Sequence, residues 1–152
     1  MRDKSAAAQD YFESGCNCAQ SVLAAFCDEA GVSQTQAERL AWGLGGGMGK
    51  LGEVCGAVSA AFMALGGAAE GDDTRDKEQR MALYARVRAF AQTFEEKNGS
   101  ILCRELMKNA RDNAGSAQCE EKREFYLARP CRKYVDDAVE ILSEMLAAAD
   151  EA

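Results

Sequence analysis

The chain has 152 residues, 47% of them hydrophobic, which is enough for one domain with a buried core. Its 25 acidic side chains outnumber its 18 basic ones, giving a formal net charge of −7. This charge opposes binding to nucleic acid or to an anionic membrane, so we expect neither partner and a single domain over residues 1–152.

The first fifteen residues carry acidic side chains and only a short alanine run, unlike a secretory signal. The longest apolar run, around Val54 to Leu65, is well short of the roughly 20 residues that span a bilayer. We therefore expect a cytoplasmic protein. In a reducing compartment, its seven cysteines are expected to serve metal binding or redox chemistry rather than structural disulfides.

Helical spacing recurs throughout the chain, which predicts an all-α fold. Helices are expected over residues 3–13 and 17–30, the second with Asn17 as its N-cap, and a short helix is expected after Ser33. The segment 43–52 (GLGGGMGKLG) is expected to form turns, because glycines are costly inside a helix.

The segment 53–65 (EVCGAVSAAFMAL) is apolar on every side, which indicates a helix buried at the centre of a bundle. A long amphipathic helix is predicted over residues 76–97, and a short one begins after its cap, Ser100. The polar stretch 111–118 is expected to be irregular, and Pro130 suits the first turn of a last helix. The prediction is a single-domain bundle of about five to seven helices around the helix at 53–65.

Four cysteines fall where a predicted helix begins: Cys18, Cys55, Cys103 and Cys131. The amide N–H groups and the positive dipole end of a helix stabilise a thiolate, so cysteines at this position tend to be nucleophilic, redox-active or metal-ligating. The basic neighbours Lys50, Arg104 and Arg132 are expected to lower the thiol pKa values further. The alternative is that each cysteine is only a small hydrophobic residue of the core.

These four cysteines are too widely separated for the compact zinc and ferredoxin motifs. A helical bundle can nevertheless bring side chains from four helices together, and thiolates suit an iron–sulfur cluster, with zinc less favoured. A second hypothesis is a dithiol–disulfide couple, in which one low-pKa cysteine attacks and a neighbour resolves. A third is a non-enzymatic helical binding or assembly module whose cysteines only pack. A homodimer through an amphipathic face is compatible with all three.

The remaining cysteines have different positions. Cys27 is expected near the C-terminal end of its helix and is interpreted as inert packing. Cys16 and Cys119 are expected in loops. Because Cys16 forms a C-x-C pair with Cys18, it is interpreted either as a resolving thiol or extra ligand, or as an ordinary surface cysteine.

The glycine-rich segment does not match a phosphate-binding P-loop. Leu44 stands where that pattern needs glycine, Leu51 stands where it needs Ser or Thr, and no strand is predicted before it. We therefore expect no nucleotide, and we expect the glycines to let the backbone approach a neighbouring helix or a cofactor at Cys55. Tyr84 and Tyr134 lead apolar helix stripes and are expected to be ordinary core residues.

Four segments in order resemble the C_GCAxxG_C_C family of redox-active proteins, from about Asn17 to Leu146: NCAQSVL (17–23), GLGGGMGKLGEVCGAVSA (43–60), GSILCREL (99–106) and PCRKYVDDAVEIL (130–142). The resemblance maps the family's four characteristic cysteines onto Cys18, Cys55, Cys103 and Cys131. One position departs from the pattern, because the CGAxxG element reads CGAVSA and ends in Ala60. The methyl group of Ala60 occupies space that the family's glycine leaves open.

The resemblance implies a redox role in a bacterial protein, since members are associated with anaerobic bacteria and archaea. Some members are similar to the non-haem part of split-Soret cytochromes, which contains an iron–sulfur centre. This similarity favours electron transfer with an unknown redox partner protein, through a cluster on the four mapped cysteines. The chain has no C-x-x-C-H attachment site, so haem is not expected.

Overall fold

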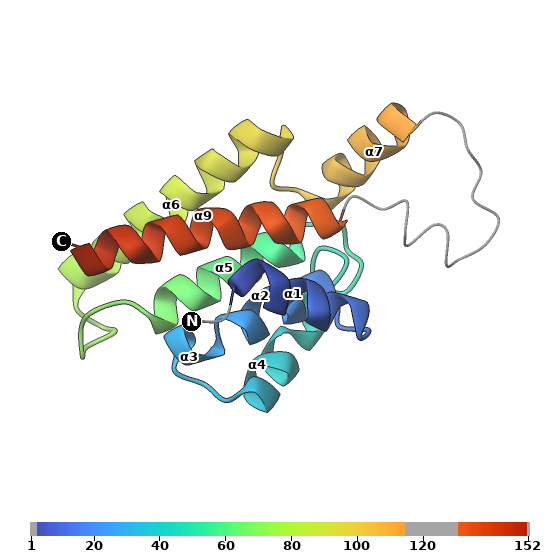
Figure 1. Cartoon of the computed structure of the whole chain (residues 1–152). Helices are drawn as coiled ribbons and strands as arrows, with labels where there is room; N and C mark the ends of the chain where they lie inside the picture. Colours follow the sequence, from blue (N-terminus) through green and yellow to red (C-terminus); the bar gives the residue numbers. More distant parts are fainter. Residues whose placement is uncertain (1–2, 115–130, 152) are drawn as a thin grey trace.

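The computed structural model describes residues 3–114 and 131–151, and over these ranges the chain is all-α, as predicted (Figure 1). The helices are α1 (Lys4–Glu13), α2 (Cys18–Ala25), α3 (Cys27–Ala30), α4 (Gln34–Ala41), the 3-10 helix η1 (Trp42–Leu44), α5 (Gly56–Gly67), α6 (Lys77–Asn98), α7 (Cys103–Ala114) and α9 (Cys131–Glu151). Within these ranges β-pairing is limited to an isolated bridge between Val54 and Leu102. None of the described helices combines the length and the apolar character needed to span a bilayer.

Helix α2 begins at its predicted cap, Asn17, and α4 follows Ser33, as predicted. Asn17 and Ser33 each form a capping box at the start of α2 and α4. The predicted helix over 17–30 is divided at Phe26, whose φ of −110° ends α2, and α3 follows it directly. The division lets the Phe26 ring enter the core, where the residue is 1% exposed. Because one predicted helix becomes two, the described part of the chain has eight α-helices.

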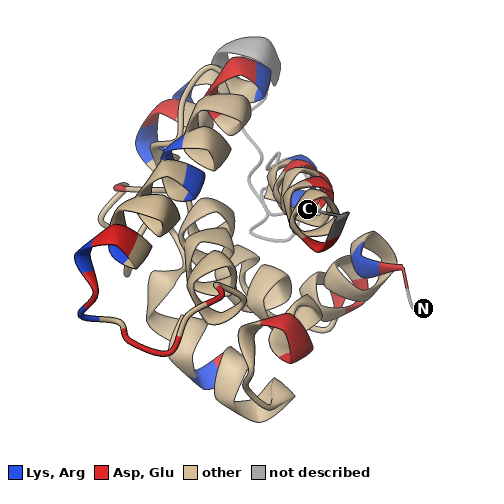
Figure 2. Cartoon of the chain, turned by 90° about the vertical axis from the view of Figure 1, so that its left-hand side faces the viewer, with Lys and Arg blue, Asp and Glu red and all other residues tan. Residues whose placement is uncertain are grey.

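Helix α5 lies at the centre of the bundle, as the apolar segment predicted. It contains no charged residue, and it packs against α2, α3, α6 and α9. Figure 2 shows the Lys, Arg, Asp and Glu residues on the outer helices and connections. Burial of apolar side chains around α5 is therefore the main stabilising contribution to the fold.

The start of α5 differs from the prediction, because residues 53–55 are extended and pair with the chain that precedes α7. The Cys55 N–H donates to the Ile101 carbonyl at 2.8 Å. The Cys103 N–H donates to the Glu53 carbonyl at 2.7 Å. This pairing brings the starts of α5 and α7, each with its cysteine, side by side.

Helix α6 runs from its cap at Asp76 to Gly99, close to the predicted bounds. Phe90 and Phe94 are fully buried, whereas Tyr84 is 46% exposed. The expectation that Tyr84 belongs to the core is therefore wrong. Helix α6 lies on the outside of the bundle and packs against α5 and α9, so only one narrow face of it is covered (Figure 1).

Helix α7 begins later and ends later than predicted. The Ser100 hydroxyl accepts a hydrogen bond from the Leu102 N–H, and the helix starts only at Cys103. Residues 111–114 are helical, although irregular structure was expected there. The rest of the polar stretch and Pro130 lie outside the described residues.

Helices α1 and α9, from opposite ends of the chain, pack against each other (Figure 1). The Gln9 side-chain amide donates to the Arg132 carbonyl at 3.1 Å, and the Arg132 guanidinium pairs with Glu13 at 2.8 Å. Glu13 is the last residue of α1, and Arg132 is the second residue of α9, directly after Cys131. This contact therefore places Cys131 close to the connection that leads into Cys18.

Candidate functional site

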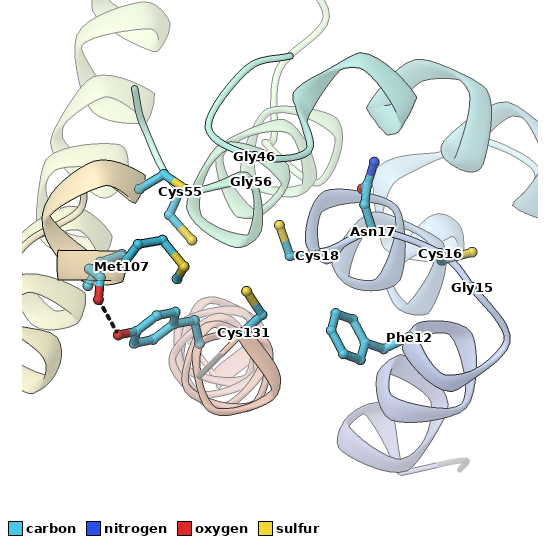
Figure 3. Close-up of a pocket in the computed structure, with 13 residues that line it drawn as sticks. Phe12, Gly15, Cys16, Asn17, Cys18, Gly46, Cys55, Gly56, Met107 and Cys131 are labelled. Atoms are coloured by element: carbon cyan, nitrogen blue, oxygen red, sulfur yellow. Dashed lines mark hydrogen bonds between the residues drawn. The ribbon is translucent and has the colours of Figure 1, made fainter. Parts of the chain in front are cut away.

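The four cysteines mapped from the sequence line one cavity of about 470 Å³. Cys18, Cys103 and Cys131 are the first residues of α2, α7 and α9, and Cys55 directly precedes α5. Figure 3 shows Cys18, Cys55 and Cys131 directed into a common space between α2, α5 and α9. The predicted position of these cysteines at helix N-termini is thus confirmed.

Two glycines permit the close approach of the chain segments around this cavity. A Cβ atom on Gly56 would lie only 2.6 Å from the Cys18 sulfur. A Cβ atom on Gly47, whose φ is +69°, would lie 2.6 Å from the Cys103 Cβ. Any larger residue at these positions would push a cysteine out of place, which explains why the segment before α5 is rich in glycine.

Residues 46–50 form a left-handed turn, with every φ between +60° and +69°. Met48 and Lys50 adopt this conformation although they are not glycines, which costs conformational energy. The Gly46 N–H of this turn donates a hydrogen bond to the Cys18 sulfur. The turn therefore supplies an amide that stabilises negative charge on Cys18.

The pKa of the Cys18 thiol is lowered from 9.0 to about 7. The largest cause is a hydrogen bond donated by the Cys55 thiol, and the backbone N–H groups of Gly46, Ala19 and Ala57 lower the pKa further. Burial opposes these effects by raising the pKa. As a result, a large fraction of Cys18 is a thiolate near neutral pH.

The thiol of Cys55 shifts in the opposite direction, with its pKa raised well above 9. Donation of its hydrogen bond to Cys18 is the largest cause, followed by burial and by the negative charge of Cys18. Cys55 is 5% exposed, whereas Cys18 is half-buried. The expectation that the helix start would lower the pKa of Cys55 is wrong, because its neighbour holds the negative charge instead.

The basic side chains that neighbour these cysteines in sequence form ion pairs away from the cavity. Arg104 pairs with Glu53 at 3.2 Å, and Arg132 pairs with Glu13 at 2.8 Å. Among the described residues, the causes of the pKa shifts of Cys18 and Cys55 include no Lys or Arg. The thiol pair and backbone amides lower the pKa of Cys18, whereas the thiol pair and burial raise the pKa of Cys55.

Tyr134 was expected to be an ordinary core residue, but it also forms part of the cavity wall. Its hydroxyl donates to the Leu106 carbonyl at 3.3 Å (Figure 3). Burial, and then the nearby Cys131 and Cys55, raise the pKa of Tyr134 to about 12, so the phenol stays protonated. Its spacing of three residues from Cys131, which places both on one helix face, is the sequence signal that could have identified it.

The remaining cysteines do not join this group. Cys16 borders the cavity, but Figure 3 shows its sulfur directed away from Cys18, and burial raises its pKa. Cys27 packs against the core, as expected, but at the start of α3 rather than in a last helical turn, because the predicted helix is divided. Cys119 lies outside the described residues.

Thiolates suit iron or zinc as ligands, but the arrangement of the described side chains does not fit a metal site. Among the side chains that the structure describes, no group of three or more Cys, Asp or Glu is placed to hold one ion. No disulfide joins the six described cysteines. What this part of the chain presents is a hydrogen-bonded thiol pair, Cys18 and Cys55, with Cys103 and Cys131 on the same cavity.

Comparison with curated proteins and with solved structures gave no significant match. A family model described as "Putative redox-active protein (C_GCAxxG_C_C)" matches residues 16–145. The match covers most of the chain and includes the four cysteines of the cavity together with Cys16, Cys27 and Cys119. The chain therefore belongs to the C_GCAxxG_C_C family of redox-active proteins.

Proposed function

We propose that the protein is a thiol–disulfide oxidoreductase in which Cys18 is the nucleophile and Cys55 the resolving cysteine. The observation that carries the proposal is the hydrogen bond from the Cys55 thiol to Cys18, with pKa values shifted in opposite directions. A half-buried thiolate beside a buried, protonated thiol has the division of roles that thiol–disulfide exchange requires.

The first step of the exchange forms a mixed disulfide. The Cys18 thiolate attacks one sulfur of a substrate disulfide, the substrate S–S bond breaks, and one substrate thiolate leaves. Cys55 then loses its proton to the first leaving thiolate and attacks the Cys18 sulfur, and the Cys18–substrate bond breaks. The second substrate sulfur leaves as a thiolate and takes a proton from water. The substrate gains two electrons, the cysteine pair loses two, and a reducing dithiol of a partner protein restores the pair.

A second candidate function is electron transfer through an iron–sulfur cluster. The observation that favours it is that Cys18, Cys55, Cys103 and Cys131 all line one cavity. The described side chains are not arranged to share an ion, so dithiol chemistry agrees better with the geometry. Zinc is less favoured than iron, because zinc has no redox chemistry of its own.

Anaerobic purification followed by limited oxidation distinguishes the two candidates. The reduced protein is treated with one equivalent of a small disulfide and digested, and the linked peptides are identified by mass spectrometry. We expect a Cys18–Cys55 disulfide and a colourless protein without stoichiometric metal. Brown protein with about two or more irons per chain and thiolate-to-iron absorption would instead establish the cluster.

Two serine variants provide the matched comparison. Cys18→Ser is expected to abolish both the disulfide and the fast reaction of the protein with iodoacetamide. Cys16→Ser is expected to keep both, because the Cys16 sulfur is directed away from the pair (Figure 3). Equal loss in the two variants would contradict the assigned roles.

A further inference from the structure

Apart from the Cys18 thiolate, the cavity has no charged side chain among the described residues that line it, because none of these is Lys, Arg, Asp or Glu. Phe12, Leu106, Met107 and Tyr134 form much of its wall, together with cysteines and glycines. Figure 3 shows Phe12 and Met107 on opposite sides of the space into which Cys18 is directed. Its volume of about 470 Å³ lies in the range of pockets that enclose small organic ligands.

The polar groups of this wall are largely engaged within the protein. The Tyr134 hydroxyl donates to the Leu106 carbonyl, and the Asn17 side-chain amide donates to the Trp42 carbonyl. An anionic ligand buried here would find no positive charge on the described wall and would face the Cys18 thiolate, and burying an unpaired charge is costly. An apolar ligand would lose little on leaving water.

We infer, on the basis of the proposed function, that the substrate is a small and largely apolar organic disulfide that carries no negative charge. Its carbon groups pack against Phe12 and Met107, and one of its sulfurs contacts Cys18. The exchange is the one described above, so the organic disulfide is reduced to two thiols and the cysteine pair is oxidised. Anionic disulfides bind less well, because the cavity wall offers them no counter-charge and the net charge of −7 repels them.

Selectivity for charge is measured with two pairs of probes. The first pair is neutral iodoacetamide and anionic iodoacetate, which alkylate Cys18 without any resolving step. The second pair is neutral 4,4′-dithiodipyridine and dianionic 5,5′-dithiobis(2-nitrobenzoate), which also test disulfide exchange. Each rate is divided by the rate of 2-mercaptoethanol with the same probe, at a pH where both thiols are ionised. We expect the normalised rates to favour the neutral member of each pair about tenfold.

Two methionine variants test whether the cavity wall causes this selectivity. Met107→Lys places a positive charge in the wall, and we expect it to lower the preference for neutral probes about tenfold. Met81→Lys adds the same charge on α6 at a residue that is 44% exposed and outside the cavity, so its preference is expected to match that of the wild type. An equal change in both variants would overturn the inference.

The outcomes separate this inference from the proposed function. If the Cys18–Cys55 disulfide forms but neutral and anionic probes have equal normalised rates, the inference fails and the proposed function stands. The inference also fails if insulin disulfides are reduced faster than 4,4′-dithiodipyridine, because the substrate would then be a protein. If Cys18 prefers neutral alkylating agents but no disulfide reaches Cys55, dithiol cycling fails.

Discussion

At the scale of single residues, the direction of one hydrogen bond gives two chemically identical thiols different pKa values. Cys18 and Cys55 both lie at helix starts, yet the backbone N–H groups of Gly46 and Ala19 and the Cys55 thiol all donate to Cys18. Cys55 keeps its proton because it donates this hydrogen bond to Cys18 and is also more deeply buried. The division of roles follows from the tertiary environment, and the two local sequences alone do not encode it.

Removal of Cys55 is expected to raise the pKa of Cys18. Its hydrogen bond is the largest cause of the lowered pKa, so in Cys55→Ala the midpoint of the pH–rate curve for alkylation moves from about 7 towards 9. At pH 7 the variant therefore reacts several-fold more slowly than the wild type. The measurement is the iodoacetamide rate at Cys18 across pH 5–10, followed by mass spectrometry. An unchanged midpoint would show that amides alone set the pKa.

Replacement of Ser59 is expected to stabilise the fold. The Ser59 hydroxyl is buried and has no hydrogen-bond partner in the part of the chain that the structure describes. Ser59→Ala removes a polar group that is buried without a partner, which raises the free energy of unfolding by roughly 1 kcal/mol. Urea denaturation of the reduced protein measures it.

Ser21 provides a matched control for this prediction. It is buried even more deeply, at 0% exposure against 7% for Ser59, but its hydroxyl donates to the Asn17 carbonyl at 2.8 Å. Ser21→Ala is expected to lower the free energy of unfolding by roughly 1 kcal/mol, because a hydrogen bond is lost. A shift of the same sign in both variants would contradict the account of Ser59.

At the scale of elements, irregular segments position the site more than the helices do. The extended residues 53–55 pair with the chain before α7, and this pairing joins two cysteine-bearing helix starts. The left-handed turn at 46–50 then directs the Gly46 N–H at Cys18. Helical periodicity predicted where the helices lie, but it placed 53–55 in a helix, because pairing between distant segments leaves no local pattern.

A methyl group at Gly56 is expected to disturb Cys18 specifically. The added Cβ would lie 2.6 Å from the Cys18 sulfur and 3.0 Å from the Leu44 carbonyl oxygen, so the sulfur must move away from its amide donors. Gly56→Ala should lower the alkylation rate of Cys18 at pH 7 at least fivefold and raise the pKa of this thiol. Stopped-flow alkylation and circular dichroism separate this effect from unfolding.

Gly66 gives the control within the same helix. A Cβ there would meet only Leu83 at 3.9 Å, which is an ordinary contact. Gly66→Ala is therefore expected to leave the Cys18 rate unchanged and to stabilise α5 by up to about 1 kcal/mol, because alanine has the higher helix propensity. A loss of Cys18 reactivity in this variant would mean that general perturbation of α5, rather than contact with the sulfur, controls the thiol.

At the scale of the whole molecule, the fold class and the central apolar helix were predictable, because periodicity and composition report directly on burial. The gathering of Cys18, Cys55, Cys103 and Cys131 was suggested by their shared helix position and by the family pattern. The cavity wall was harder to predict. Phe12, Met107 and Tyr134 have the spacing of ordinary core residues, and only the packing of α1, α7 and α9 around the cavity distinguishes them.

Oxidation of the thiol pair is expected to stabilise the whole domain. A bond between Cys18 and Cys55 would close a loop that contains α2, α3, α4 and the glycine-rich segment, and so reduce the conformational entropy of the unfolded chain. The expected gain in the free energy of unfolding is about 3–4 kcal/mol for a loop of this length. Urea denaturation of the reduced and oxidised protein measures the gain, and Cys18→Ser, which cannot form the bond, should show none.

The two sulfurs already share a hydrogen bond, so little rearrangement of the chain should offset the gain. An oxidised form less stable than the reduced one would show that the surrounding helices hold the two sulfurs apart.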